Sequence, residues 1–99
     1  MVEKRLSPKG KSVRVTFELP GEIARQSVAV AGDFNAWSTE TDLMKYNKKK
    51  DVWSKAISFK PGDRLQFRYL VDGDNWRNDE AADHYVANPY FCENGVLEL

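Results

Sequence analysis

The sequence has 99 residues, of which 41% are hydrophobic and 12% aromatic, and this suffices for one domain with a small packed core. Its 15 basic side chains balance its 15 acidic ones, so it lacks the basic excess that binds nucleic acid or an anionic membrane surface. The single cysteine, Cys92, excludes an internal disulfide and favours a reducing compartment. The first residues are polar, and no apolar run reaches the roughly 18 residues of a membrane span. We therefore expect a cytoplasmic protein that binds neither nucleic acid nor a membrane.

The first third of the chain predicts a leader and two strands. Residues 1–11 carry no core-forming pattern, and we expect a flexible leader before a single domain over 12–99. From Val13 to Leu19 apolar and polar side chains alternate, which is the period of a strand with one buried face. Pro20-Gly21 ends this strand, residues 22–26 can form one helical turn at most, and a second strand is predicted over about 27–32.

The remainder of the chain predicts further short strands. They span 43–46, 52–59 after a polar hairpin tip, 65–71, and roughly 94–99. Asp72-Gly73 is a strong signal for a tight turn, whereas 77–89 is polar and is expected to be irregular. No segment of ten residues holds a helical period. Six or seven short strands separated by turn signals predict an all-β, antiparallel β-sandwich.

The three tryptophans have different sequence surroundings. Trp37 follows a loop of small and polar residues, and it either folds back over the core or lies exposed as a flat binding surface. The pattern favours neither alternative. Trp76 has polar neighbours on both sides, which favours exposure, while Trp53 shares a strand face with Ile57 and Phe59, which predicts core packing.

Two exposed indoles would suit a neutral sugar, because the C–H face of glucose is apolar while its hydroxyls point to the rim. If the pair loses about 150–200 Å² of apolar area, the gain is roughly 4–5 kcal/mol. Ordering the sugar subtracts from this, so the expected dissociation constant is on the order of micromolar to millimolar. Arg68 lies on the outward face of the strand over 65–71. It either donates to sugar hydroxyls or pairs with a neighbouring acid in solvent.

The other polar residues give little support to catalysis or metal binding. The acids between residues 72 and 83 could in principle serve glycoside hydrolysis, but no apolar pocket sequence accompanies them to raise one pKa. We expect solvated loop carboxylates at Asp72, Asp74, Asp79, Glu80 and Asp83. Trp76 occupies the next ligand position of a calcium loop, and His84 and Cys92, each the only residue of its type, cannot form a zinc cluster. Cys92 lacks a nucleophile context, and Lys48-Lys49-Lys50 is expected to be a solvated hairpin tip. We predict no catalytic residue, no metal and no cofactor.

Three segments carry a family resemblance in this order along the chain: AGDFNAWS, DVWSKAISFKPGDRLQFRYLVDGDNW and NGVLEL. Together they resemble the family-48 carbohydrate-binding modules, also called early-set isoamylase N-terminal domains. That group includes the glycogen-binding module of the β subunit of AMP-activated protein kinase. The resemblance covers about 13–99. It implies an immunoglobulin-like sandwich of the early set that binds α-1,4-linked glucan, such as glycogen, starch or maltooligosaccharide, and is not an enzyme.

The resemblance also implies roles for individual residues. Trp37 and Trp76 match the two tryptophans on which sugars stack, and Asn94 matches an asparagine that bonds to the glucan. The chain departs from the family pattern by one extra residue between Gly73 and Trp76, which could rotate that indole.

Three further positions carry substitutions relative to the kinase-type module. Arg68 stands where that module has a lysine that contacts sugar hydroxyls, and its fork is planar and longer. Tyr90 stands where a leucine reaches into the ring of a cyclic glucan. Cys92 stands where a threonine donates a hydroxyl, and a thiol is a poorer donor.

The partners are therefore expected to be a glycogen-like glucan and, in trans, a glycogen-metabolising enzyme or a regulatory subunit. Many family members brace an adjoining amylase-type barrel, for which 99 residues leave no room. The leading hypothesis is non-catalytic binding of α-glucan by tryptophan stacking. The alternative is a protein-interaction or regulatory module of the same fold without a working sugar site, whose aromatic patch contacts a partner protein.

Overall fold

The computed structural model of the chain describes residues 2–88 and 92–99. Within these ranges it has nine strands and two short 3-10 helices. The strands are β1 (Val2–Leu6), β2 (Val13–Pro20), β3 (Val28–Gly32), β4 (Lys45–Asn47), β5 (Val52–Phe59), β6 (Arg64–Val71), β7 (Asn75–Arg77), β8 (His84–Ala87) and β9 (Glu93–Glu98), and the 3-10 helices are η1 (Gly21–Ile23) and η2 (Asp33–Asn35).

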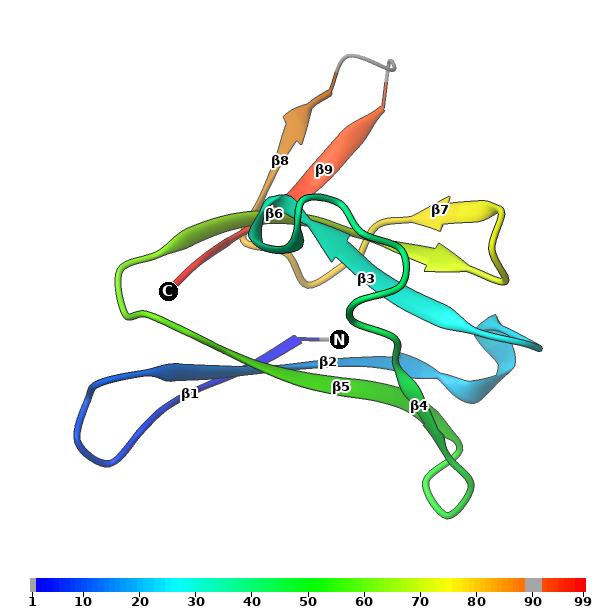
Figure 1. The fold of residues 1–99 in the computed structure, drawn as a ribbon, viewed down its shortest axis with the longest axis horizontal. Helices are drawn as coiled ribbons and strands as arrows, with labels where there is room; N and C mark the ends of the chain where they lie inside the picture. The colour runs from blue at the N-terminus through cyan, green and yellow to red at the C-terminus, as the bar shows by residue number, and fades with distance from the viewer. Residues whose placement is uncertain (1, 89–91) are drawn as a thin grey trace.

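Two antiparallel sheets face one another, as Figure 1 shows. One sheet has the strand order β1-β2-β5-β4 and the other the order β3-β6-β9-β8, with β7 added beside β6. The predicted all-β antiparallel sandwich is confirmed, and its architecture is consistent with an immunoglobulin-like fold. None of the helices among the described residues is long and apolar enough to cross a membrane.

The core lies between β2 of the first sheet and β6 of the second. The alternation from Val13 to Leu19 buries one face of β2, as its period predicts. The ring of Phe17 lies 5.2 Å from that of Phe67 and 6.3 Å from that of Tyr69, centroid to centroid. These side chains are fully buried, so they fix the face that β6 turns inward and leave Arg68 on the other face.

The N-terminal segment corrects the expectation of a leader without regular structure. Residues 2–6 form β1, which pairs along its length with β2, from Val2↔Phe17 to Leu6↔Val13. The edge of β2 offers unpaired backbone groups that β1 satisfies, and Val2 packs against the core. The sequence pattern did not signal this strand because all but one of its residues are exposed.

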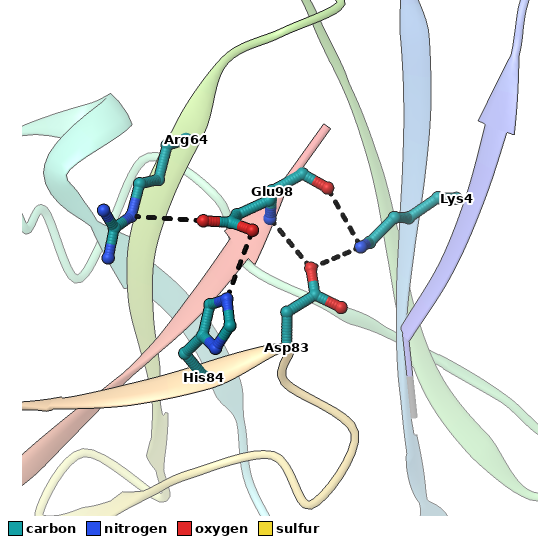
Figure 2. A network of polar contacts seen from close by, with 5 residues as sticks. All are labelled: Lys4, Arg64, Asp83, His84 and Glu98. Atoms are coloured by element: carbon teal, nitrogen blue, oxygen red, sulfur yellow. Dashed lines mark hydrogen bonds and ion pairs between the residues drawn. The ribbon is translucent and has the colours of Figure 1, made fainter.

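A polar network ties β1 to the opposite sheet (Figure 2). The Lys4 ammonium group contacts the Asp83 carboxylate and donates to the Glu98 carbonyl at 3.1 Å. The Glu98 amide donates to Asp83 at 2.8 Å, and the Glu98 carboxylate lies 3.1 Å from His84 Nε2 and 3.9 Å from Arg64 Nε. This cluster therefore joins the edge strand of one sheet to β9 and the start of β8 in the other.

Three smaller differences from the sequence expectations concern strands and burial. The segment over 77–89, expected to be irregular, contains β8, which pairs with β9 from His84↔Val96 to Ala87↔Glu93. The short strand expected over 43–46 lies at 45–47 instead. Trp53 packs against the core as predicted but is only half-buried, and its indole N–H donates to the Gly21 carbonyl at 3.3 Å.

Candidate functional site

The loop that carries Trp37 holds an unusual backbone conformation. After β3 and η2, Ala36 and Trp37 both adopt left-handed dihedrals, with φ of 56° and 59°. For a bulky residue this region is disfavoured, so it persists only where neighbouring contacts impose it. The Trp37 amide donates to the Gly32 carbonyl at 2.7 Å, which closes the loop and turns the indole outward.

Asn35 and Gly32 are the residues that impose this conformation. The Asn35 side chain accepts from the Gly32 amide at 3.0 Å and donates to the Val30 carbonyl at 3.0 Å and to Asp42 Oδ2 at 2.9 Å. A Cβ on Gly32 would lie 2.2 Å from the Gln66 carbonyl oxygen, a distance that real contacts do not reach. Glycine is therefore required at this position by the close approach of β6.

The second tryptophan is held by the hairpin between β6 and β7. Asp72 and Gly73 have φ of 52° and 80°, as the predicted tight turn requires. The three loop residues 72–74 accommodate the extra residue, and Trp76 pairs with Leu70 on the face of β6 that also carries Arg68.

The Asp72 side chain anchors this turn to the loop before β3. Its carboxylate accepts from the backbone amides of Gln26 at 2.7 Å, Arg25 at 3.0 Å and Ser27 at 3.1 Å. These bonds, that from Gln26 above all, lower the pKa of Asp72 below its ordinary value. Asp72 is thus a turn anchor as well as a surface carboxylate.

Trp37 and Trp76 line one open hollow of about 940 Å³. Both side chains are exposed, at 37% and 39% of their full area, so of the two interpretations left open for Trp37 the structure selects the exposed one. Exposure of Trp76 is confirmed. The residues around the hollow are Trp37, Gln66, Arg68, Trp76, Asn88, Cys92 and Asn94.

The polar part of the hollow is built on Asn94, which is only 8% exposed. Its Nδ2 donates to Gln66 Oε1 at 3.2 Å, and its Oδ1 accepts from Asn88 Nδ2 at 3.1 Å. Each group of a side-chain amide can form two hydrogen bonds, so the amides of Asn94 and Gln66 keep donor and acceptor capacity for a ligand. Cys92 is exposed, and its amide donates to Asn88 Oδ1 at 3.2 Å.

Arg68 is the charged member of the hollow. Its guanidinium carbon lies 5.9 Å from the centroid of the Trp76 ring, within the range of a cation–π contact. The Nε of Arg68 is buried and has no hydrogen-bond partner among the described residues. The sequence analysis considered a neighbouring acid as the alternative partner of Arg68. No acid that the structure describes is bonded to this nitrogen.

Five of the six residues that the family resemblance indicated lie around this hollow: Trp37, Arg68, Trp76, Cys92 and Asn94. The sixth, Tyr90, lies outside the described residues. The sequence analysis missed Gln66 and Asn88. Gln66 could have been found from strand alternation, because it lies two residues before Arg68 on the same face, but Asn88 gave no signal in a segment expected to be irregular.

Asp79 corrects the prediction of five solvated acids. It is 3% exposed and accepts from the Tyr69 hydroxyl at 2.6 Å and from the Ala81 amide at 2.8 Å. Burial of the phenol, together with the adjacent Asp79 carboxylate, raises the pKa of Tyr69. In the described part of the chain, no group of three or more His, Cys, Asp or Glu side chains is arranged to hold a metal ion.

A β-sandwich with two exposed indoles beside a polar, amide-lined floor has the features of a carbohydrate-binding module. Residues 13–90 match the model of the family described as the glycogen recognition site of AMP-activated protein kinase. The chain belongs to this family of non-catalytic, glycogen-recognising carbohydrate-binding modules.

Two further comparisons bear on the fold. No curated protein sequence matches the chain significantly. The crystal structure of ferric enterobactin esterase from Salmonella typhimurium matches with a TM-score of 0.75 and 12% identity, over 99% of this chain and 34% of the esterase chain. At this identity the likeness concerns the fold alone, and the chain spans about a third of the esterase's length.

Proposed function

We propose that the protein binds an α-1,4-linked glucan, such as glycogen, starch or a maltooligosaccharide, by stacking glucose units on Trp37 and Trp76. The observation that carries this proposal is that both indoles are exposed and line one hollow. An indole face covers the apolar C–H face of a sugar and leaves the hydroxyls to polar groups. The membership of a glycogen-recognising family supports the same ligand class.

The polar residues of the hollow fix the hydroxyls in this proposal. Asn94 offers the remaining capacity of its amide, and Arg68 offers guanidinium N–H groups. Cys92 lies at the same hollow with a weakly donating thiol, and Tyr90 keeps the role that the family resemblance implies. The described lining groups are indoles, amides, a guanidinium and a thiol. Glycoside hydrolysis needs a pair of carboxylates, so this lining supports binding without catalysis.

We also infer a cytoplasmic location and a glycogen-metabolising enzyme or regulatory subunit as a partner in trans. The exposed Cys92, which is the only cysteine of the sequence and forms no disulfide, supports a reducing compartment.

Titration with maltoheptaose and with β-cyclodextrin, followed by calorimetry and tryptophan fluorescence, tests the proposed function. The wild-type protein should saturate with a dissociation constant on the order of micromolar to millimolar. Trp37→Ala and Trp76→Ala should each weaken binding by at least about tenfold, since each removes roughly half of the stacking area.

Trp53→Phe is the matched control, because Trp53 is half-buried and does not line the hollow. It should leave the affinity within about twofold of wild type, while circular dichroism verifies that all variants are folded. The proposal is contradicted if the wild type shows no saturable response up to about 10 mM sugar. Recovery of a protein partner without retention on amylose resin would favour the protein-interaction alternative.

A further inference from the structure

A second hollow, of about 530 Å³, adjoins the first and shares Arg68 and Trp76 with it. Its volume is within the range of about 300–1,000 Å³ that small-molecule sites occupy. The residues that line it are Leu19, Pro20, Ile23, Arg68, Trp76, Arg77, Asn78, Asp79 and Glu80. Because two side chains border both hollows, the hollows meet at Arg68 and Trp76.

The topology of β7 explains why one short strand serves both hollows. Neighbouring residues of a strand point to opposite faces, so Trp76, paired with Leu70, and Arg77, paired with the inward-facing Tyr69, project to different sides. On the Arg77 side lies the end of β2 with η1, which contributes Leu19 and Ile23. The second hollow is therefore formed by both sheets of the sandwich.

The wall of this hollow over residues 78–80 is held in place by Asp79. Its carboxylate is bonded to the Tyr69 hydroxyl and to the Ala81 amide, and its carbonyl accepts from the Tyr85 hydroxyl. Asn78 Nδ2 donates to the Glu93 carbonyl at 2.8 Å. These hydrogen bonds of Asp79 fix the backbone of residues 78–80. The side chains beside Asp79, such as that of Glu80, can then contact a ligand in the hollow.

The chemistry of the lining suits a further sugar unit. Leu19, Pro20 and Ile23 supply an apolar surface, while the side chains of Arg77 and Glu80 are exposed at the same hollow. Two arginines and two acids line the hollow, so their formal charges cancel and a neutral, polar ligand is favoured over an ion. Arg68 lines both hollows, and its guanidinium group supplies N–H donors for sugar hydroxyls at their boundary.

We propose that the second hollow is an additional glucose subsite, which holds the part of an α-glucan chain that extends beyond Trp76. The protein then prefers long glucan chains to short ones, because only a chain that passes Trp76 occupies both hollows. This inference rests on the proposed function, since the first hollow must bind glucan for the second to extend it.

Amide chemical-shift mapping with maltotriose and maltoheptaose tests the subsite in the wild-type protein. Both sugars should shift amides beside the first hollow, such as those of Trp37 and Asn94. Only maltoheptaose should shift the amides of Ile23, Arg77 and Glu80. Shifts confined to the first hollow with both sugars would overturn the subsite and leave the proposed function intact. Shifts at neither hollow would refute the proposed function and the subsite with it.

Arg77→Ala gives an independent measurement, with Arg14→Ala as its matched control. Arg14 is an exposed strand arginine of the other sheet, outside both hollows. Arg77→Ala should weaken maltoheptaose binding by about three- to tenfold, the loss expected for one ordinary hydrogen bond, and leave maltotriose binding unchanged. Arg14→Ala should change neither. An equal effect of Arg77→Ala on both sugars, or no effect on either, contradicts the additional subsite.

Discussion

At the residue scale, Trp37 shows that the exposure of a side chain can be decided by a neighbour. Its own loop gave no preference between a buried and an exposed indole, because small and polar residues are compatible with both. Asn35 decides the matter through its bonds to the backbone at Gly32 and Val30, which hold two successive residues in the left-handed region. The left-handed conformation of this loop therefore depends on the Asn35 side chain together with Gly32.

Asn35→Ala should lower both stability and glucan affinity. The variant loses three hydrogen bonds of a half-buried side chain, which predicts a decrease of about 1–3 kcal/mol in the free energy of unfolding. Trp37 should then relax from its left-handed conformation, so that affinity for maltoheptaose falls several-fold. Urea denaturation and calorimetric titration measure the two effects.

Asn47→Ala is the control for this prediction, because Asn47 bonds to the backbone of an exposed hairpin tip far from the hollow in the sheet order. It should leave the affinity unchanged. Wild-type affinity in a folded Asn35→Ala variant would show that Trp37 is positioned by other contacts.

The environments of Asp72 and Asp79 could not be predicted from the neighbouring sequence. Asp72 and Asp79 stand in an acidic, polar run whose sequence predicts solvated carboxylates, yet Asp79 is buried against Tyr69 and Asp72 bonds to the loop before β3. Their partners lie 10 and 46 residues away. No local pattern contains contacts of that sequence separation.

The lowered pKa of Asp72 predicts that the stability of the protein depends on pH. This pKa is lowered in the folded state, whereas the unfolded carboxyl titrates near its ordinary value of about 3.9. The unfolded state therefore takes up the proton first as the pH falls. The contribution of the Asp72 carboxylate to the free energy of unfolding is therefore complete above the unfolded pKa. It is lost as the pH drops toward the folded pKa.

Asp72→Asn tests this sign, because asparagine also tolerates the left-handed conformation of this position. At pH 7 the wild type should be more stable than the variant in urea denaturation, and the difference should shrink as the pH is lowered to about 3. A difference that stays constant over this range would show that the carboxylate charge does not stabilise the turn.

At the scale of secondary-structure elements, β1 is the clearest case in which a strand is defined by its partner. Its exposed, charged residues do not alternate between apolar and polar. The strand forms because its backbone pairs with the edge of β2 and because Lys4 contacts acceptors on Asp83 and Glu98. Partial burial acts to raise the pKa of Asp83, and the Glu98 amide and Lys4 outweigh that effect and lower it. β2 and β6, which each have a buried face, were predicted from alternation because burial of every second side chain produces that period.

Lys4→Met should weaken the attachment of β1 more than Arg5→Met does. The Lys4 side chain is 32% exposed and contacts acceptors in the opposite sheet, whereas Arg5 is 79% exposed and lies 3.5 Å from Glu3 on its own strand. We expect a loss of about 0.5–1 kcal/mol for the first variant and less than about 0.5 kcal/mol for the second.

Urea denaturation at low and at 1 M salt measures this difference, which salt should reduce because screening weakens exposed ion pairs. Equal effects of the two substitutions would mean that the network in Figure 2 does not contribute to the attachment of β1.

At the scale of the whole molecule, the sandwich followed from periodicity, but the candidate site did not. The hollow combines the loop after β3, the β6–β7 hairpin and the start of β9, which are separated by tens of residues in the sequence. Only the resemblance to a family indicated that Trp37, Trp76 and Asn94 act together. Asn88 became visible only when the second sheet was assembled and brought it beside Asn94, whereas strand alternation alone places Gln66 on the same face as Arg68.

Contact between the two indoles and one sugar chain is the central claim, and intermolecular nuclear Overhauser effects measure it directly. With maltoheptaose bound, ring protons of both Trp37 and Trp76 should show effects to the C–H protons of glucose, while those of Trp53 should show none. Saturable binding in which either Trp37 or Trp76 gives no such effect would contradict stacking on the pair.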